Sequence, residues 1–90
     1  MPPGNRRTVI RGSRFEASLE GLFGNWRDAE RFIDSAEVVL AIDAELGIEV
    51  GEGIWALPMA PVRDGGVWLY YTFYETVVVL LEITVVYEGD

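Results

Sequence analysis

The sequence predicts an α+β fold of two layers, with a helical hairpin packed on a small, twisted, mainly antiparallel sheet in the order β-α-α-β-β-β. Residues 67–88 form a nearly unbroken run of β-forming side chains, which fits two strands joined by a short turn. Residues 14–46 instead repeat their apolar side chains at helical spacing. An apolar sheet face and apolar helix stripes bury each other, so the two observations together predict two packed layers.

Length and composition restrict the class of protein. Ninety residues predict a single domain over residues 1–90, with residues 1–6 flexible. Half the residues are hydrophobic, and mean hydropathy is +0.19, which excludes general disorder. The longest apolar stretch, residues 76–86, is interrupted by Glu82 and is too short to span a bilayer as a helix. No secretory signal follows Arg6 and Arg7, so we expect a cytoplasmic protein without membrane contact.

The chain contains neither cysteine nor histidine, which excludes disulfides, thiolate chemistry and the commonest general base. Fifteen acids allow a metal site made of carboxylates alone, but no calcium-loop spacing is present. Glu75 and Glu82 could be read as an acid–base pair, although surface charge on a sheet explains them better. We therefore expect no metal and no cofactor.

Charge is unevenly distributed along the chain. Seven arginines face fifteen acids, for a net charge of −8. Arg6, Arg7, Arg11 and Arg14 lie in the first fourteen residues, which contain no acid. The cluster could contact an anion, but a solvated N-terminus is the simpler interpretation. An acidic body repels phosphates, which disfavours direct nucleic-acid binding and still permits a basic partner.

The N-terminal half predicts a short strand and two helices. The β-branched residues 8–10 predict the strand. Ser13 and Glu16 match a capping box for a helix over residues 14–23, which Gly24 ends. Asn25 can cap a second helix over residues 26–46, which Gly47 ends. Because only two residues separate them, the helices are expected to form an antiparallel hairpin.

The C-terminal half predicts three strands. Residues 49–53 read as a loop, residues 54–59 as a strand near a sheet edge, and residues 61–66 as a turn. Residues 67–74 and 77–87 are the two following strands. Strict alternation in the last strand places one wholly apolar set against the helices, namely Val77, Val79, Leu81, Ile83, Val85 and Tyr87. The other set is then the partner-binding face, namely Val78, Leu80, Glu82, Thr84 and Val86.

The tryptophans and tyrosines permit two interpretations. Trp26, Trp55 and Trp68 could line a ligand pocket, but in a domain this small they fit the core or an interface better. The four tyrosines, Tyr70, Tyr71, Tyr74 and Tyr87, could stack on nucleic-acid bases. They sit among acids rather than among lysines and arginines, which favours structural or partner-binding roles.

Three segments follow a recurring family pattern. They are a short strand leading into Phe15-x-x-x-Leu19-x-x-Leu22, the helix exit at residues 39–47 (VLAIDAELG), and residues 54–59 (IWALPM) followed by residues 68–72 (WLYYT) and the closing strand. Together they resemble the RelE/ParE superfamily of toxins from bacterial toxin–antitoxin pairs, closer to its ParE-like branch. The resemblance covers nearly the whole chain and rests on apolar positions and turns rather than on an invariant motif.

The resemblance implies a toxin that acts by protein binding and is neutralised by a cognate antitoxin. In the ParE branch the target is DNA gyrase. Other members cut messenger RNA on the ribosome with basic residues on the sheet, and this chain lacks most of them. Two alternatives stay open. One is a non-toxic relative that acts as a homodimeric interaction module. The other is a ribosome-dependent mRNA endonuclease, whose candidate catalytic residues are Tyr87, Arg63, Arg11 and Arg14.

Overall fold

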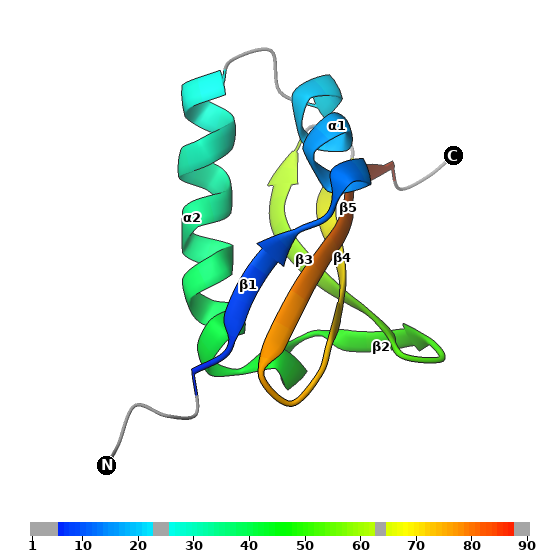
Figure 1. The fold of residues 1–90 in the computed structure, drawn as a ribbon. Coiled ribbons are helices and arrows are strands. Elements are labelled where there is room, and N and C mark those ends of the chain that lie inside the picture. Colours follow the sequence, from blue (N-terminus) through cyan, green and yellow to red (C-terminus); the bar gives the residue numbers. More distant parts are fainter. Residues whose placement is uncertain (1–5, 23–25, 63–64, 88–90) are drawn as a thin grey trace.

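A computed structural model describes residues 6–22, 26–62 and 65–87 of the 90-residue chain, excluding the side chains of residues 22, 26–29, 32, 60–62, 65 and 85–87. Five strands, two α-helices and one 3₁₀ turn follow each other along these residues (Figure 1). The elements are β1 (Thr8–Arg11), α1 (Ser13–Leu22), α2 (Trp26–Ile42), the 3₁₀ turn η2 (Ala44–Leu46), β2 (Ile48–Gly51), β3 (Ile54–Val62), β4 (Gly65–Phe73) and β5 (Val77–Tyr87).

The strands form one sheet in the order β1-β5-β4-β3-β2. β1 runs parallel to β5, with Val9 opposite Val78, and every other neighbouring pair is antiparallel. The parallel pair is possible because α1 and α2 form part of the long connection between β1 and the rest of the sheet. The predicted two-layer α+β fold with a mainly antiparallel sheet is therefore confirmed.

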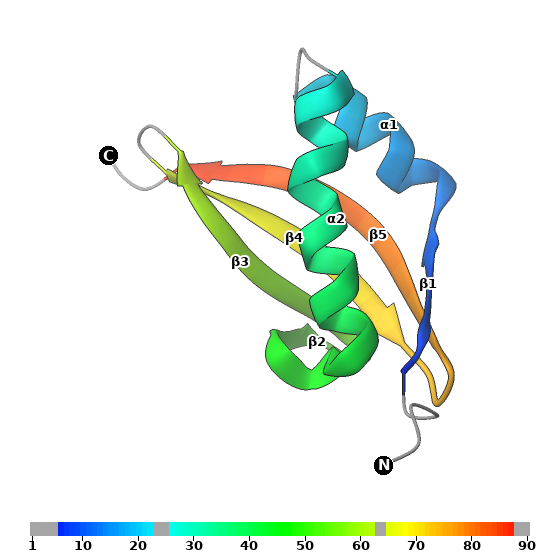
Figure 2. The same cartoon turned by 90° about the vertical axis from the view of Figure 1, so that its left-hand side faces the viewer.

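One hydrophobic core joins both helices to one face of the sheet. Figure 2 shows α2 crossing in front of the sheet, with α1 beside it. Phe15 and Leu19 of α1 and Ile33 and Leu40 of α2 are fully buried. They pack with further buried side chains of α2, η2, β4 and β5, namely Ala36, Ala44, Val67, Leu69, Tyr71, Val78, Leu80 and Ile83. Burial of this size is the main stabilising contribution in a domain of 90 residues.

Several boundaries differ from the sequence-based prediction. Residues 61–62 and 65–66 were predicted as turn but belong to strands, because β3 extends to Val62 and β4 begins at Gly65. α2 ends at Ile42 rather than Leu46, because the Asp43 carboxylate accepts a hydrogen bond from the Glu45 amide and starts a separate 3₁₀ turn. Residues 49–53 were predicted as loop, but residues 48–51 form the edge strand β2, which turns into β3 through Gly53 at a φ of +76°. Ser13 was predicted to cap a helix that begins at Arg14, but it is itself the first residue of α1. The Gly12 carbonyl accepts hydrogen bonds from the amides of Phe15 and Glu16.

A β-bulge in β5 overturns the predicted assignment of its two faces. Tyr70 pairs with Glu82, but its neighbour Tyr71 pairs with Leu80, so Leu81 is an extra residue in β5. The alternation therefore changes phase at Leu81. Val78 and Leu80 face the helices and are fully buried, so they do not belong to a partner-binding face. Val77, Val79 and Leu81, which were predicted to meet the helices, are half-buried and absent from the core cluster.

Candidate functional site

The face of the sheet opposite the helices is the candidate functional surface. Ile10, which is 48% exposed, pairs with Val79 at the β1 side of this face. Across the sheet the same face carries Trp68 opposite Thr84 and Tyr70 opposite Glu82. The described side chains on this face are thus largely apolar or aromatic, which is unusual for a sheet face without a covering layer.

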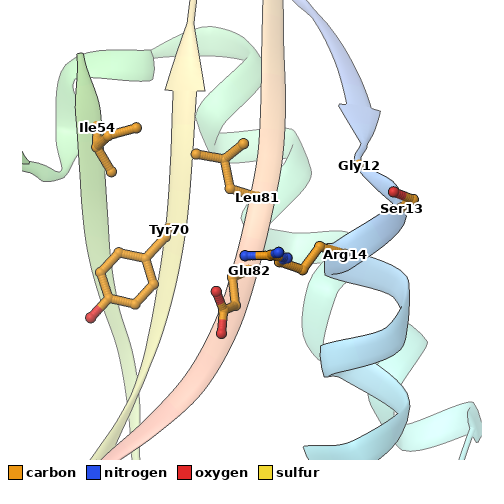
Figure 3. Close-up of a pocket in the computed structure, with 7 residues that line it drawn as sticks. All are labelled: Gly12, Ser13, Arg14, Ile54, Tyr70, Leu81 and Glu82. Atoms are coloured by element: carbon orange, nitrogen blue, oxygen red, sulfur yellow. The ribbon is translucent and has the colours of Figure 1, made fainter. Parts of the chain in front are cut away.

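A cavity of about 600 Å³ opens on this face where β1 passes into α1. Figure 3 shows its lining, which comes from the start of α1 and from three strands of the sheet. The lining residues are Gly12, Ser13, Arg14, Ile54, Tyr70, Leu81 and Glu82. The walls are mainly apolar, and the two charged side chains, Arg14 and Glu82, reach into the opening from α1 and β5.

The local sequence explains why the cavity forms here. The Gly12 amide donates to the Leu80 carbonyl at 2.9 Å, and a β-carbon on Gly12 would lie 3.0 Å from that oxygen. Glycine therefore lets β1 turn sharply into α1 against β5. Further along, Ser18 Oγ accepts from the Ile83 amide at 3.1 Å and donates to the Phe15 carbonyl at 2.9 Å. These bonds hold α1 on the edge of β5 just beyond the bulged residue Leu81.

The charge arrangement in the cavity suits recognition better than phosphate chemistry. Arg14 is exposed on α1, and among the described residues neither Arg14 nor Glu82 belongs to an ion pair. Among the described lining residues, the positive charge of Arg14 is offset by the negative charge of Glu82. Cleavage of RNA by its 2′-hydroxyl instead needs a base and several cations around the phosphorane.

Arg11 was a catalytic candidate, and the structure places it elsewhere. Its guanidinium donates to the Glu37 carboxylate at 2.7 Å and to both carboxylate oxygens of Glu30 at 2.8 and 3.1 Å. Glu16 lies 3.6 Å away. Hydrogen bonds to the two partners raise the pKa of Arg11, and the bond from Arg11 lowers the pKa of Glu30. Arg11 therefore ties β1 to α2 and is not among the described residues that line the cavity, so its catalytic role stays a prediction.

Arg7 is also ordered, contrary to the expected solvated N-terminus. Its Nε atom donates to the Tyr74 carbonyl at 2.7 Å, and its guanidinium lies 5.1 Å from the centre of the Phe73 ring. Its backbone amide donates to the Ala41 carbonyl at 2.8 Å. The four N-terminal arginines therefore do not form one anion-binding cluster. Arg7 and Arg11 support the fold, Arg14 borders the cavity, and Arg6 is exposed.

The remaining candidates divide into those the structure describes and those it does not. Arg63 lies outside the described residues, and the side chains of Val86 and Tyr87 are not described. Glu82 and Thr84 do lie on the face away from the helices. Ile54 and Leu81 line the cavity without having been predicted there. Strand alternation could have found Ile54, whereas no sequence signal marks the bulge that turns Leu81 outward.

The described part of the chain offers neither a metal site nor a membrane-spanning helix. Residues 6–22, 26–62 and 65–87 contain no group of three acids placed to hold a metal ion. Among these same residues, no helix has the length and apolar character needed to cross a bilayer.

Trp55 packs against the hydrophobic core beside Phe73, with ring centres 5.3 Å apart.

Comparison with known proteins identifies the fold. No protein-family model matches the sequence, and no curated protein matches it. One similar solved structure is a chain of the toxin–antitoxin complex RelBE2 from Mycobacterium tuberculosis, which is 19% identical. The TM-score is 0.66, and the match covers 94% of each chain. Identity at this level reports on architecture alone. The chain therefore shares its overall fold with this chain of the RelBE2 complex.

Proposed function

We propose that this protein is the toxin component of a bacterial toxin–antitoxin pair, that it acts by binding a protein target, and that a cognate antitoxin neutralises it. The shared fold supports the first part, because the similar structure is a toxin–antitoxin complex. DNA gyrase is the target that the ParE resemblance implies. The open sheet face, with Tyr70 and Leu81 in a mainly apolar cavity, is the surface that the target or the antitoxin would cover.

The observation that carries the binding mechanism is the composition of the cavity. Among the described residues of its lining, Arg14 is the one cation, and the Glu82 carboxylate lies in the same opening. A phosphorane needs several positive charges, whereas an apolar cavity with one charge of each sign can recognise an apolar side chain and its polar neighbours. The net charge of −8 further weakens attraction to RNA.

Growth after inducible expression in a bacterium tests the proposal. The protein is expressed alone and together with the product of the neighbouring small reading frame. Growth arrest that the neighbour relieves is the expected result. Leu81→Arg, which places a charge at the apolar wall, should remove the toxicity, while Arg6→Ala, at an exposed position outside the cavity, should keep it. Unimpaired growth with the wild-type protein would overturn the proposal and leave a homodimeric interaction module, which light scattering would detect.

A messenger-RNA endonuclease is the second candidate, because Arg14 reaches into the cavity. Primer extension on cellular transcripts after induction would detect cleavage at defined codons. Under this alternative Arg14→Ala abolishes the cleavage and Arg6→Ala does not. Tyr87→Phe and Arg63→Ala complete the set, since both were predicted as catalytic. Arrest of growth without transcript cleavage would exclude this candidate and favour a protein target.

A further inference from the structure

The β-bulge brings an apolar and an acidic side chain to the same cavity. In a regular strand, consecutive residues point to opposite faces of the sheet. Leu81 is the extra residue of the bulge, and its neighbour Glu82 pairs with Tyr70, so both side chains lie on the face away from the helices. Bulges re-aim side chains in this way and are frequent next to active sites. The bulge therefore sets a carboxylate directly beside an apolar wall.

Three neighbouring strands supply the apolar floor of the cavity. Ile54 of β3, Tyr70 of β4 and Leu81 of β5 line it, and all three side chains are half-buried. Figure 3 shows Arg14 reaching toward the sheet from α1. The volume of about 600 Å³ falls within the range of about 300–1,000 Å³ that is typical of small-molecule sites. The floor therefore suits an aromatic ring or a branched aliphatic group.

The two charged side chains of the cavity are not paired with each other. Among the described residues, the ion pairs all belong to Arg11, and none joins Arg14 to Glu82. Both side chains belong to exposed residues. The planar guanidinium of Arg14 can bind a carboxylate through two parallel hydrogen bonds. The Glu82 carboxylate can accept hydrogen bonds from an ammonium group.

A ligand with a single charge would satisfy only half of this arrangement. An anion would be attracted by Arg14 and repelled by Glu82, and the reverse holds for a cation. A zwitterion places one group of each sign opposite the matching side chain. Its net charge of zero also avoids repulsion from a protein of net charge −8. An apolar amino acid is such a zwitterion, and its hydrophobic group lies on the carbon between the two charges.

We propose that the cavity binds a free amino acid with a large apolar side chain. The α-carboxylate of the ligand pairs with Arg14, and its α-ammonium group pairs with Glu82. The ligand's side chain lies on the floor formed by Ile54, Tyr70 and Leu81. Bound there, the amino acid occupies the surface that the proposed function assigns to a protein partner, so ligand and partner would compete. Binding of the amino acid itself does not depend on whether the protein is a toxin.

L-phenylalanine and three analogues test the proposal with the full chain, because each analogue lacks one feature of the ligand. Phenethylamine lacks the carboxylate, 3-phenylpropionate lacks the ammonium group, and glycine lacks the apolar side chain. Chemical-shift titrations by NMR give the dissociation constants and identify the residues in contact. L-phenylalanine should bind at least about tenfold more tightly than each analogue, with the shifts centred on the cavity.

Two substitutions separate the two charge contacts. Arg14→Gln should weaken L-phenylalanine and 3-phenylpropionate about tenfold without weakening phenethylamine. Glu82→Gln should weaken L-phenylalanine and phenethylamine about tenfold without weakening 3-phenylpropionate. Arg6→Gln and Glu45→Gln are the matched controls, because they remove the same charges at exposed positions outside the cavity and should change no affinity.

Several outcomes would overturn the proposal. They are equal affinity for L-phenylalanine and any of its analogues, shifts centred outside the cavity, or Arg14→Gln and Glu82→Gln variants that weaken both singly charged analogues alike. Absence of L-phenylalanine binding would leave the cavity to a protein partner. Failure of the toxin hypothesis is distinguishable from all of these, since a protein that is harmless in the growth assay can still bind the amino acid.

Discussion

The hydroxyl group of Tyr71 donates a hydrogen bond to the backbone carbonyl of Ala44 at 2.6 Å, deep under the end of α2. The same hydroxyl accepts a bond from the Gly47 amide at 3.1 Å. One side chain of β4 therefore holds both ends of the 3₁₀ turn η2. Burial raises the pKa of Tyr71, so the phenol stays protonated and keeps its hydrogen for the Ala44 carbonyl.

Tyr71→Phe should lower the free energy of unfolding by about 1–3 kcal/mol, because it leaves a carbonyl and an amide without their partner. Urea denaturation followed by circular dichroism measures the change. Tyr74→Phe is the matched control, since Tyr74 is 64% exposed and the same atom is removed. Equal stability of the two variants would mean that η2 does not depend on the Tyr71 hydroxyl.

Arg11→Gln should reduce stability at neutral pH, because Glu30 and Glu37 are left close together and the bidentate contact is lost. The pH dependence of the stability that this ion pair contributes follows from the lowered pKa of Glu30. A carboxylate whose pKa falls on folding contributes stability above its unfolded value of 4.5, and the contribution is lost as pH falls through the folded value.

The wild-type protein should therefore lose stability below about pH 4.5 more steeply than Arg11→Gln does. Thermal unfolding midpoints between pH 3 and 7 measure the difference. Arg6→Gln is the control, because Arg6 is exposed and loses the same charge. Parallel pH profiles for the wild-type and Arg11→Gln proteins would contradict a stabilising role for the ion pair.

The β-bulge predicts opposite results for two adjacent leucines. Leu80→Ala should cost about 2–5 kcal/mol, because Leu80 is fully buried beneath the helices. Leu81→Ala should cost about 1 kcal/mol or less, because Leu81 is half-buried at the cavity wall on the other face. The chemical change is identical, so denaturant unfolding compares the positions directly. A larger loss for Leu81→Ala would restore the uninterrupted alternation expected from sequence.

The sequence predicts the fold more completely than it predicts the site. Runs of β-branched, aromatic and other apolar residues identify β1, β3, β4 and β5, and apolar stripes identify both helices. β2 was not predicted, because a strand of only four residues flanked by glycines shows almost no alternation of apolar and polar side chains. The predicted faces of β5 are wrong from Val77 to Leu81 and right from Glu82 to Thr84, since a bulge depends on pairing with β4 and not on the strand's own sequence. The ion pairs of Arg11 could not be predicted, because its partners lie 19 and 26 residues away in the sequence.

The close approach of Gly47 to β3 supplies the last prediction. Its φ of −79° suits any residue, so backbone conformation does not demand glycine here. A β-carbon would instead lie 2.6 Å from both the Ala56 carbonyl oxygen and the Tyr71 hydroxyl. Neither atom can move freely, since one is backbone and the other is held by two hydrogen bonds. Gly47→Ala should therefore lower the unfolding free energy by about 1–3 kcal/mol.

Gly21→Ala makes the same substitution where a β-carbon would meet nothing within 4 Å. It lies within α1, and alanine there should raise stability by about 0.5–1 kcal/mol. If the steric clash determines the effect at Gly47, urea denaturation should show a lower free energy of unfolding for Gly47→Ala and a higher one for Gly21→Ala. In the double variant Gly47→Ala with Tyr71→Phe, removal of one of the two clashing oxygens should make the combined loss smaller than the sum of the single losses. Strict additivity would locate the strain at the Ala56 carbonyl alone.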